Sequence, residues 1–211
     1  GDVVMWAAIG GIVGSRVYYI VENFSRFLVD PMGMIFSGAG LVFLGGLMGG
    51  TAAVSILAIR RGFKWFEFAD MVAPLIIMGY AIGRIGCLLV GDDYGIPTDV
   101  PWAMTFPIGT PPTTIPVHPT QIYETLLGFG IFTVLWKLRG KLTPHGLLFS
   151  LYLILAGMER FFIEFIRMNP KYLFGLSGAQ IISILMVLLG TILIVRLRQA
   201  AGEKAILESS P

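Results

Sequence analysis

The side chains most able to do chemistry in this chain are charged groups inside long apolar stretches. Arg84 lies in one such stretch, and Arg160 and Glu164 lie in another. A charge deep in a bilayer costs at least about 2.5–3.5 kcal/mol on insertion scales, so it usually has a partner and a purpose. A guanidinium binds phosphate through paired N–H donors, which the point charge of lysine does not reproduce. Arg84 and Arg160 therefore suit the phosphate of an anionic lipid headgroup.

The same charges also have a structural interpretation. Arg160 and Glu164 stand four residues apart on one helix face, where they can neutralise each other as an ion pair. Arg84 has no acid within a turn on its own helix, and the flanking Gly83 and Gly86 favour a backbone that exposes it. We therefore expect the two arginines to leave a surplus of positive charge near the outer leaflet.

The overall composition is that of a membrane protein. Of the 211 residues, 55% are hydrophobic and only 13% are charged, whereas a soluble domain typically carries about 25% charged residues. A chain with one cysteine cannot form an intramolecular disulfide, and its two histidines, His118 and His145, are too few and too separated to suggest a metal cluster. No basic, aromatic-rich stripe is present, so we expect neither a metal nor a nucleic-acid partner.

Six apolar stretches are long enough to cross a bilayer as helices. The predicted helices cover residues 3–21, 40–59, 68–90, 120–138, 146–166 and 178–197. The predicted fold class is all-α: a polytopic integral membrane helix bundle of about six transmembrane helices. We expect residues 1–211 to form a single transmembrane domain.

The basic residues orient this bundle. Nine Lys and Arg residues lie in the segments 60–64, 137–141 and 196–204, whereas the opposite loops carry few. By the positive-inside rule those three segments are cytoplasmic. Residues 91–119, which are rich in Pro, Gly and Thr, then form an outer, periplasmic cap loop. Residues 22–37, with many apolar and few charged side chains, are typical of an arm lying at the membrane interface.

Small residues cluster in the first two predicted helices. Gly10 and Gly14 lie in the first, and Gly45, Gly46 and Gly49 lie in the second. Such spacing lets helix backbones approach closely, and we favour packing for most of these glycines. Room for a lipid chain beside Gly45 and Gly46 is the alternative.

Five motifs follow one another along nearly the whole chain. They occupy residues 83–95, 101–107, 118–124, 160–167 and 178–180. In content and order they resemble the signatures of the prolipoprotein diacylglyceryl transferases. No single motif would carry the resemblance, but the five together do.

The resemblance implies an activity and a location. Enzymes of this family transfer diacylglyceryl from phosphatidylglycerol to the lipobox cysteine thiol of a preprolipoprotein, forming a thioether and releasing glycerol phosphate. They need no cofactor and work among the lipids of the bacterial inner membrane, facing the periplasm. A transporter or channel for an anionic or lipid substrate is the alternative, although the chain lacks the internal repeat that many transporters show.

The resemblance also implies roles for individual residues. It places Arg84 and Arg160 at the phosphate as catalytic and substrate-binding groups. The other substrate-binding residues implied by the motifs are Asp92, Gly95, Gln121, Tyr123, Glu124, Glu164, Gly45 and Gly46.

Three positions depart from the family pattern. Leu44 precedes Gly45 and Gly46 where the family often has a histidine, which is a favoured catalytic base. Cys87 stands where many relatives have Asn, and Ala156 stands where the family has a Tyr. We also expect the usual N-terminal helix of the family to be absent.

His118 is the remaining candidate for a catalytic base. Leucine at position 44 cannot take a proton, whereas imidazole exchanges protons near neutral pH, and His118 stands at the outer start of the helix predicted over 120–138. The alternative is that His118 only orders the cap through hydrogen bonds to Gln121 or Tyr123. In that case the thiol ionises in the field of the two arginines, and the sequence leaves both possibilities open.

Overall fold

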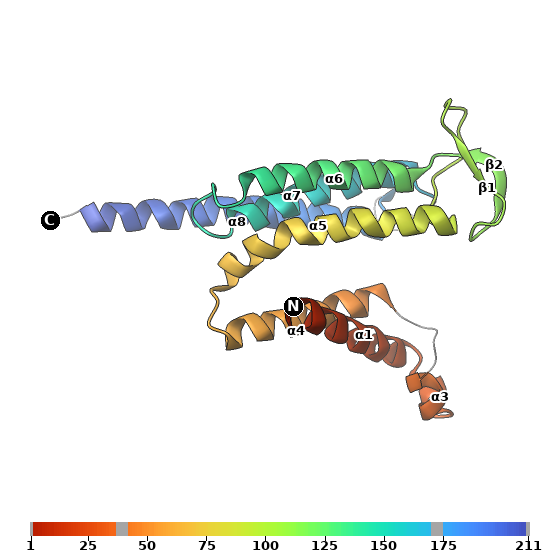
Figure 1. The fold of residues 1–211 in the computed structure, drawn as a ribbon, viewed down its shortest axis with the longest axis horizontal. Helices are drawn as coiled ribbons and strands as arrows, with labels where there is room; N and C mark the ends of the chain where they lie inside the picture. Colours follow the sequence, from red (N-terminus) through yellow and green to blue (C-terminus); the bar gives the residue numbers. More distant parts are fainter. Residues whose placement is uncertain (1, 37–41, 170–174, 210–211) are drawn as a thin grey trace. The chain divides into compact units, whose positions relative to one another are not determined.

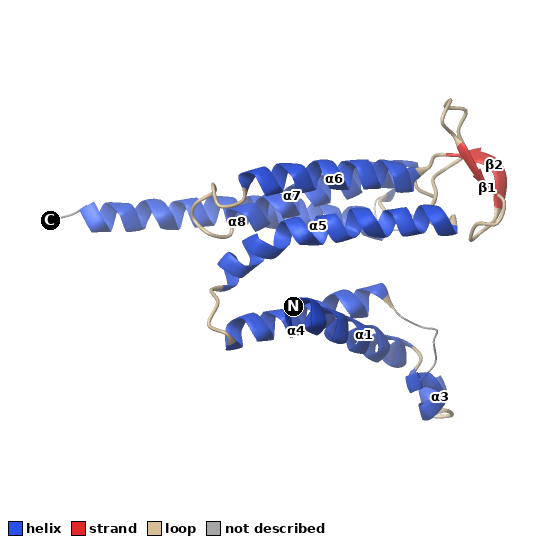
Figure 2. Ribbon diagram, viewed as in Figure 1, coloured by secondary structure: helices blue, strands red, loops and turns tan. Residues whose placement is uncertain are grey.

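The chain is mostly helical in a computed structural model that describes residues 2–36, 42–169 and 175–209 (Figure 1). It divides into two compact units, residues 1–68 and 69–211. Figure 2 separates the helices from one pair of short strands. The elements are α1 (Asp2–Glu22), α2 (Phe24–Phe27), α3 (Pro31–Phe36), α4 (Phe43–Arg60), α5 (Trp65–Val90), β1 (Met104–Phe106), β2 (Thr113–Val117), α6 (Thr120–Leu138), α7 (Leu147–Ile163), a 3₁₀ turn (Glu164–Ile166) and α8 (Gly178–Ser209).

All six predicted helices are present, and the range predicted over 120–138 coincides with α6. Within the described parts of the chain, three helices are long and apolar enough to cross a membrane: Asp2–Glu22, Trp65–Val90 and Gly178–Glu203. Large apolar side chains on these helices, such as Val4, Leu89 and Leu185, are exposed. Lipid is the solvent that suits such a surface. A helical membrane protein is confirmed, while the count of six spans stays a prediction.

In the first unit, α1 packs on α4 through glycine backbone. A Cβ on Gly14 would collide with the carbonyl oxygen of Gly45, and a Cβ on Gly49 would collide with that of Gly10. A Cβ on Gly46 would lie 2.6 Å from the Ser15 Oγ. The packing interpretation of these glycines is therefore confirmed, because small residues are what lets two helices approach this closely.

The segment between α1 and α4 contains two short helices, α2 and α3. The Arg16 guanidinium of α1 donates to the Met34 carbonyl oxygen at 3.0 Å and so ties α3 to α1. Several apolar side chains of the segment between α1 and α4 are exposed, among them Phe24, Leu28 and Met32. The predicted arm covers this segment, and its last residue, Ser37, lies outside the described residues.

In the second unit, α5, α6, α7 and α8 share an apolar core that includes Ile77, Leu135, Leu148 and Ala156. α8 packs on α7, where a Cβ on Gly190 would lie 2.6 Å from the Ser150 carbonyl oxygen of α7. The start of α7 is held from a different helix. The Asp70 carboxylate of α5 accepts the backbone N–H groups of residues 146 and 149 at 2.7 and 2.8 Å, which satisfies donors that a helix start otherwise leaves unpaired.

The segment between α5 and α6 folds around Tyr94 and Phe106, whose rings stack with centroids 5.4 Å apart. The Tyr94 hydroxyl donates to the Pro111 carbonyl oxygen at 2.7 Å. β1 and β2 pair antiparallel here, beyond the end of α5 and the start of α6 (Figure 1). The all-α expectation is therefore wrong for this segment, because Thr113-Thr114-Ile115 is a β-branched run that favours a strand. Its outer position stays a prediction.

Candidate functional site

The site of the second unit is built around Glu124, a fully buried carboxylate on α6. Three arginines surround it. Arg84 of α5 places Nε 3.2 Å from Oε2 of Glu124. Arg160 of α7 and Arg167, just beyond the 3₁₀ turn, place Nη1 atoms 3.0 and 3.3 Å from Oε1. A charge this deeply buried is tolerated only when it is paired. We call Arg84, Arg160 and Arg167 the arginine cluster.

Two further acids, Asp93 and Glu164, contact the arginine cluster. Asp93, which is 45% exposed, accepts from Arg84 Nη1 at 2.8 Å and from Arg167 Nη2 at 2.6 Å. Glu164 lies 2.9 Å from Arg160 Nη2, and so the predicted ion pair between these two residues is confirmed. Three guanidinium groups thus face three carboxylates.

The prediction that Arg84 and Arg160 leave a surplus of positive charge is therefore wrong. Arg84 has two acidic partners, Glu124 and Asp93. Neither lies within a turn on the helix of Arg84, so a search along that helix could not find them. The site is close to electrically balanced before any substrate arrives.

Asp93 is the most accessible of the three acids and is ionised at neutral pH. Partial burial raises the pKa of its carboxyl, but the hydrogen bonds and charges of Arg84 and Arg167 outweigh burial and hold the pKa below its ordinary value. Its backbone adopts a left-handed conformation, with φ at 59°. Asp is among the few non-glycine residues that adopt this conformation readily.

The first turn of α6 holds the loop that carries Asp93. The Thr120 hydroxyl donates to the Asp93 carbonyl oxygen at 2.8 Å, and the Gln121 side-chain amide donates to the Asp92 carbonyl oxygen at 2.5 Å. Both donors are fully buried. Gln121, predicted to bind substrate, thus contacts the loop backbone.

Gly95 lies where three backbone segments meet. Its N–H donates to the His118 carbonyl oxygen at 2.8 Å, and the Ile96 N–H donates to the Ile166 carbonyl oxygen at 2.9 Å. A Cβ on Gly95 would lie 2.5 Å from that Ile166 oxygen. The absence of a side chain therefore lets the segment that carries Arg167 dock beside the loop, and this is the structural contribution of Gly95.

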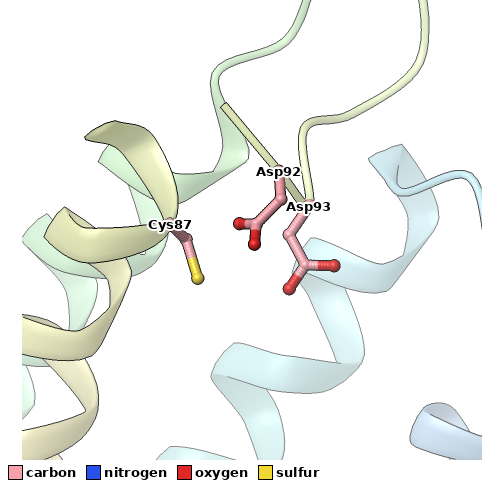
Figure 3. A group of neighbouring side chains, drawn as sticks. All are labelled: Cys87, Asp92 and Asp93. Carbon is pink, nitrogen blue, oxygen red and sulfur yellow. The ribbon is translucent and has the colours of Figure 1, made fainter. Parts of the chain in front are cut away.

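Cys87, Asp92 and Asp93 lie close together at the end of α5 and in the loop that follows (Figure 3). One potential metal-ligand atom from each residue lies within 4.8 Å of the other two. Two guanidinium groups already bind the Asp93 carboxylate. Their positive charge opposes a cation at this position, so the trio alone does not indicate a metal site.

His118 is hydrogen-bonded within the segment between α5 and α6. Its Nδ1 lies 3.2 Å from the Tyr123 hydroxyl, which also accepts from Trp102 Nε1 at 2.6 Å. If the Tyr123 hydroxyl donates to Nδ1, the neutral ring carries its hydrogen on Nε2 and neither nitrogen is a free acceptor. If Nδ1 donates instead, Nε2 keeps a basic lone pair. Tyr123, predicted to bind substrate, is the residue that holds this ring.

Tyr80 and Glu159 are polar members of the site that the sequence-based site prediction missed. The Tyr80 hydroxyl of α5 lies 3.0 Å from Glu124 Oε1 and 3.3 Å from Glu159 Oε1 of α7. The Arg84 guanidinium carbon lies 5.2 Å from the centroid of the Tyr80 ring. Signals for both were present: Tyr80 stands one turn before Arg84 on the same face, and Glu159 is an acid inside an apolar helix. Ala156, which stands where the family has a tyrosine, lies in the apolar core, and the phenol beside Glu124 comes from α5.

Arg167 was also missing from the predicted site, although it closes the motif over residues 160–167. It stands just beyond the helix predicted over residues 146–166, in a loop where a basic residue needs no special explanation. Gly45 and Gly46, by contrast, belong to the first unit and lie in the α1–α4 contact. The side chain of Leu44, the residue in place of a family histidine, lies outside the described side chains.

Comparison with known proteins points to one family. The family model for prolipoprotein diacylglyceryl transferase matches residues 1–196. The phosphatidylglycerol–prolipoprotein diacylglyceryl transferase of Idiomarina loihiensis is 36% identical over 205 residues, which cover 94% of this chain and 76% of the relative. The enzyme of the same name from Coxiella burnetii is 37% identical over 199 residues, covering 90% and 75%. That of Pseudomonas aeruginosa is 36% identical over 215 residues, covering 97% and 79%.

Proposed function

The chain belongs to the prolipoprotein diacylglyceryl transferase family, and we propose from this premise that it transfers the diacylglyceryl group of phosphatidylglycerol to the thiol of a prolipoprotein lipobox cysteine. The curated relatives carry this activity in their names. The observation that carries the proposal is the convergence of three arginines on the buried Glu124, two of which, Arg84 and Arg167, also contact the half-exposed carboxylate of Asp93. Guanidinium groups arranged in this way suit the phosphodiester of a lipid headgroup.

In the proposed reaction the substrate sulfur attacks the carbon of the diacylglyceryl group that is bonded to the phosphate oxygen. A carbon–sulfur bond forms, the carbon–oxygen bond breaks, and its electron pair leaves with glycerol phosphate. Arg84 and Arg160, together with Arg167, stabilise the charge that develops on the leaving phosphate, where a partly buried site makes such contacts stronger than in water. The thiol, with an ordinary pKa of about 8.5, reacts as thiolate.

Asp93 is the acid that the headgroup phosphate displaces in this proposal. Its side chain contacts two members of the arginine cluster and is 45% exposed, whereas the side chains of Glu124 and Glu164 are at most 1% exposed. A carboxylate and a phosphate present similar oxygen acceptors to a guanidinium. Glu124 and Glu164 then keep the arginines in place while the phosphate binds, and Asp92 and Gly95 shape the loop that releases Asp93.

For the thiol proton, His118 is the proposed base, in the tautomer that donates from Nδ1 to Tyr123 and leaves Nε2 free to accept. In the opposite tautomer His118 only orders the segment, and the thiol ionises in the field of the arginine cluster. His118→Gln separates the two. Loss of a base lowers the rate by roughly 10²–10⁴-fold, and raising the pH toward the thiol pKa restores part of that rate. If His118 is structural, activity and thermal stability fall together and high pH restores nothing.

We also propose the finer arrangement in the membrane. The chain forms one domain with about six spans in the bacterial inner membrane, the arm over residues 22–37 lies at the interface, and residues 91–119 face the periplasm. The asymmetry of basic residues and the exposed apolar side chains of the arm support this. A reporter after Arg198 should be cytoplasmic and one near Thr110 should be periplasmic. The opposite result at either site would place the arginine cluster in the wrong leaflet.

The experiment that tests the activity is a transfer assay with purified protein, phosphatidylglycerol vesicles and a lipobox peptide. Mass spectrometry should detect the peptide thioether, and glycerol phosphate should appear in equal amount. Arg84→Lys should lose most of this activity although the charge is kept, because lysine cannot donate two hydrogen bonds in a fixed plane. Arg198→Lys, an exposed substitution on α8, is the matched control. Phosphatidylglycerol movement between leaflets without any thioether would favour the transporter alternative.

A further inference from the structure

One phenol lies between two buried carboxylates in the second unit. The Tyr80 hydroxyl is 3.0 Å from Glu124 Oε1 and 3.3 Å from Glu159 Oε1. Glu124 is 0% exposed and Glu159 is 7% exposed. The three residues come from three different helices, so this contact depends on how α5, α6 and α7 pack.

Counting hydrogens shows that this arrangement needs an extra proton. A phenol carries one hydrogen and can donate to only one of the two carboxylates. If both acids were ionised, the carboxylate that does not receive the Tyr80 hydrogen would face the Tyr80 oxygen with no hydrogen between them. Two acceptors facing each other in a site with little water are costly. One of the two carboxyl groups must therefore supply a hydrogen of its own.

The surroundings decide which acid carries that hydrogen. Glu124 is ion-paired with all three members of the arginine cluster. Within the described chain, Glu159 makes no salt bridge of its own. The groups that face Glu159 are Tyr80 and Arg84 from α5, Glu124 from α6, and Tyr152 and Arg160 from α7.

We propose that Glu159 is a neutral carboxylic acid that donates to the Tyr80 oxygen, and that Tyr80 donates in turn to the Glu124 carboxylate. Glu159 and Tyr80 are then positioning residues. The hydrogen bonds from Glu159 to Tyr80 and from Tyr80 to Glu124 fix the Tyr80 ring, whose centroid lies 5.2 Å from the guanidinium carbon of Arg84. They also fix the Glu124 carboxylate that Arg84 contacts. For its effect on the reaction, this inference rests on the proposed transferase function, whereas the location of the proton does not.

The protonation state can be measured without any activity. Infrared spectra of the purified protein, in a detergent without ester groups, should contain a carboxylic-acid C=O band that Glu159→Gln removes. Glu67→Gln, which replaces an exposed acid at the start of α5, should leave the band intact. Tyr80→Phe keeps Glu159 but removes its acceptor, so the band should move to higher frequency. A wild-type spectrum without the band, or a band that neither Glu159→Gln nor Tyr80→Phe alters, overturns the proposal.

The consequence for catalysis appears in the pH profile. Glutamine at position 159 also donates to the Tyr80 oxygen and cannot lose a proton in this range. Glu159→Gln should therefore stay within about twofold of wild type at neutral pH, and its activity relative to wild type should rise at alkaline pH, where Glu159 ionises. Thiol ionisation affects both proteins equally and cancels in the ratio.

Removing the hydrogen bonds through Tyr80 should lower the activity more than Glu159→Gln does. Tyr80→Phe should lower the rate about tenfold, as expected for one hydrogen bond to a charged group, with little change in the melting temperature. A constant ratio of Glu159→Gln to wild type across pH, together with full activity in Tyr80→Phe, would show that neither residue positions the site. If no variant and no wild type transfers lipid, the proposed function fails while the infrared result still stands.

Discussion

The sharpest test of the site concerns the role of Glu124, which the family resemblance assigns to substrate and the structure buries completely. Glu124→Gln keeps the shape of the side chain and removes its charge. The carboxylate receives Arg84, Arg160 and Arg167 at 3.2, 3.0 and 3.3 Å. After the substitution, three guanidinium groups face only the carboxylates of Asp93 and Glu164, and the new amide adds donors where acceptors are needed.

The expected cost follows from burial. Removing one partner of a buried ion pair typically costs about 3–5 kcal/mol. Arg160 is 24% exposed, so some solvent screening remains and we expect about 3 kcal/mol, at the lower end. For a chain of this size that corresponds to a fall of roughly 6–12 °C in melting temperature. Thermal unfolding in detergent, followed by fluorescence, measures it.

The matched control is Asp93→Asn, the same chemical change at a site that shares Arg84 and Arg167. Asp93 is 45% exposed, so its loss should cost about 1 kcal/mol or less, and asparagine tolerates the left-handed backbone. If Glu124→Gln melts no lower than Asp93→Asn, Glu124 does not organise the arginines. If Glu124→Gln loses activity at an unchanged melting temperature, Glu124 acts on the substrate, as the resemblance implies.

Three further predictions address charge, packing and helix ends. The lowered pKa of Asp93 means that its stabilisation is present above pH 3.8, its ordinary value, and is lost as the pH falls further; the difference in melting temperature between wild type and Asp93→Asn should therefore vanish in acid. Gly14→Ala should destabilise by about 1–3 kcal/mol through the collision with Gly45, whereas Gly79→Ala, in open space, should be neutral or stabilising; equal melting temperatures would contradict this. Asp70→Ala should cost about 1–2 kcal/mol by leaving backbone donors at the start of α7 unpaired, and an unchanged melting temperature would argue against that role.

The helices could be predicted because the signal for each is local. Long apolar runs bounded by Pro, Gly and basic residues place α6 and α8 without any knowledge of their neighbours. The strands β1 and β2 were missed because each is short. They depend on pairing with each other, which a sequence of Thr, Pro and Ile does not specify alone.

The arginine cluster shows where sequence reasoning stops. Arg84 and Arg160 were found because a charged side chain inside an apolar helix is conspicuous. Their shared partner, Glu124, was taken as a substrate ligand because it closes the motif over residues 118–124 that resembles the family signature. Only the packing of α5, α6 and α7 shows that the partner of Arg84 is 40 residues away.

A balanced site also changes how the proposed chemistry works. An arginine without a carboxylate partner in the protein would be held by the substrate alone, and its side chain would have to be oriented again in each turnover. In this chain, the buried Glu124 orients Arg84 and Arg167 before substrate arrives, and the exposed Asp93 occupies the donors that remain on their accessible side. In the proposed reaction, phosphate binding then exchanges one anion for another, and the donors proposed to stabilise the leaving group are already in place. On this proposal, the buried Glu124 and Glu164 organise the arginines and the exposed Asp93 is the replaceable acid, which accounts for three carboxylates in a site that we propose binds an anion.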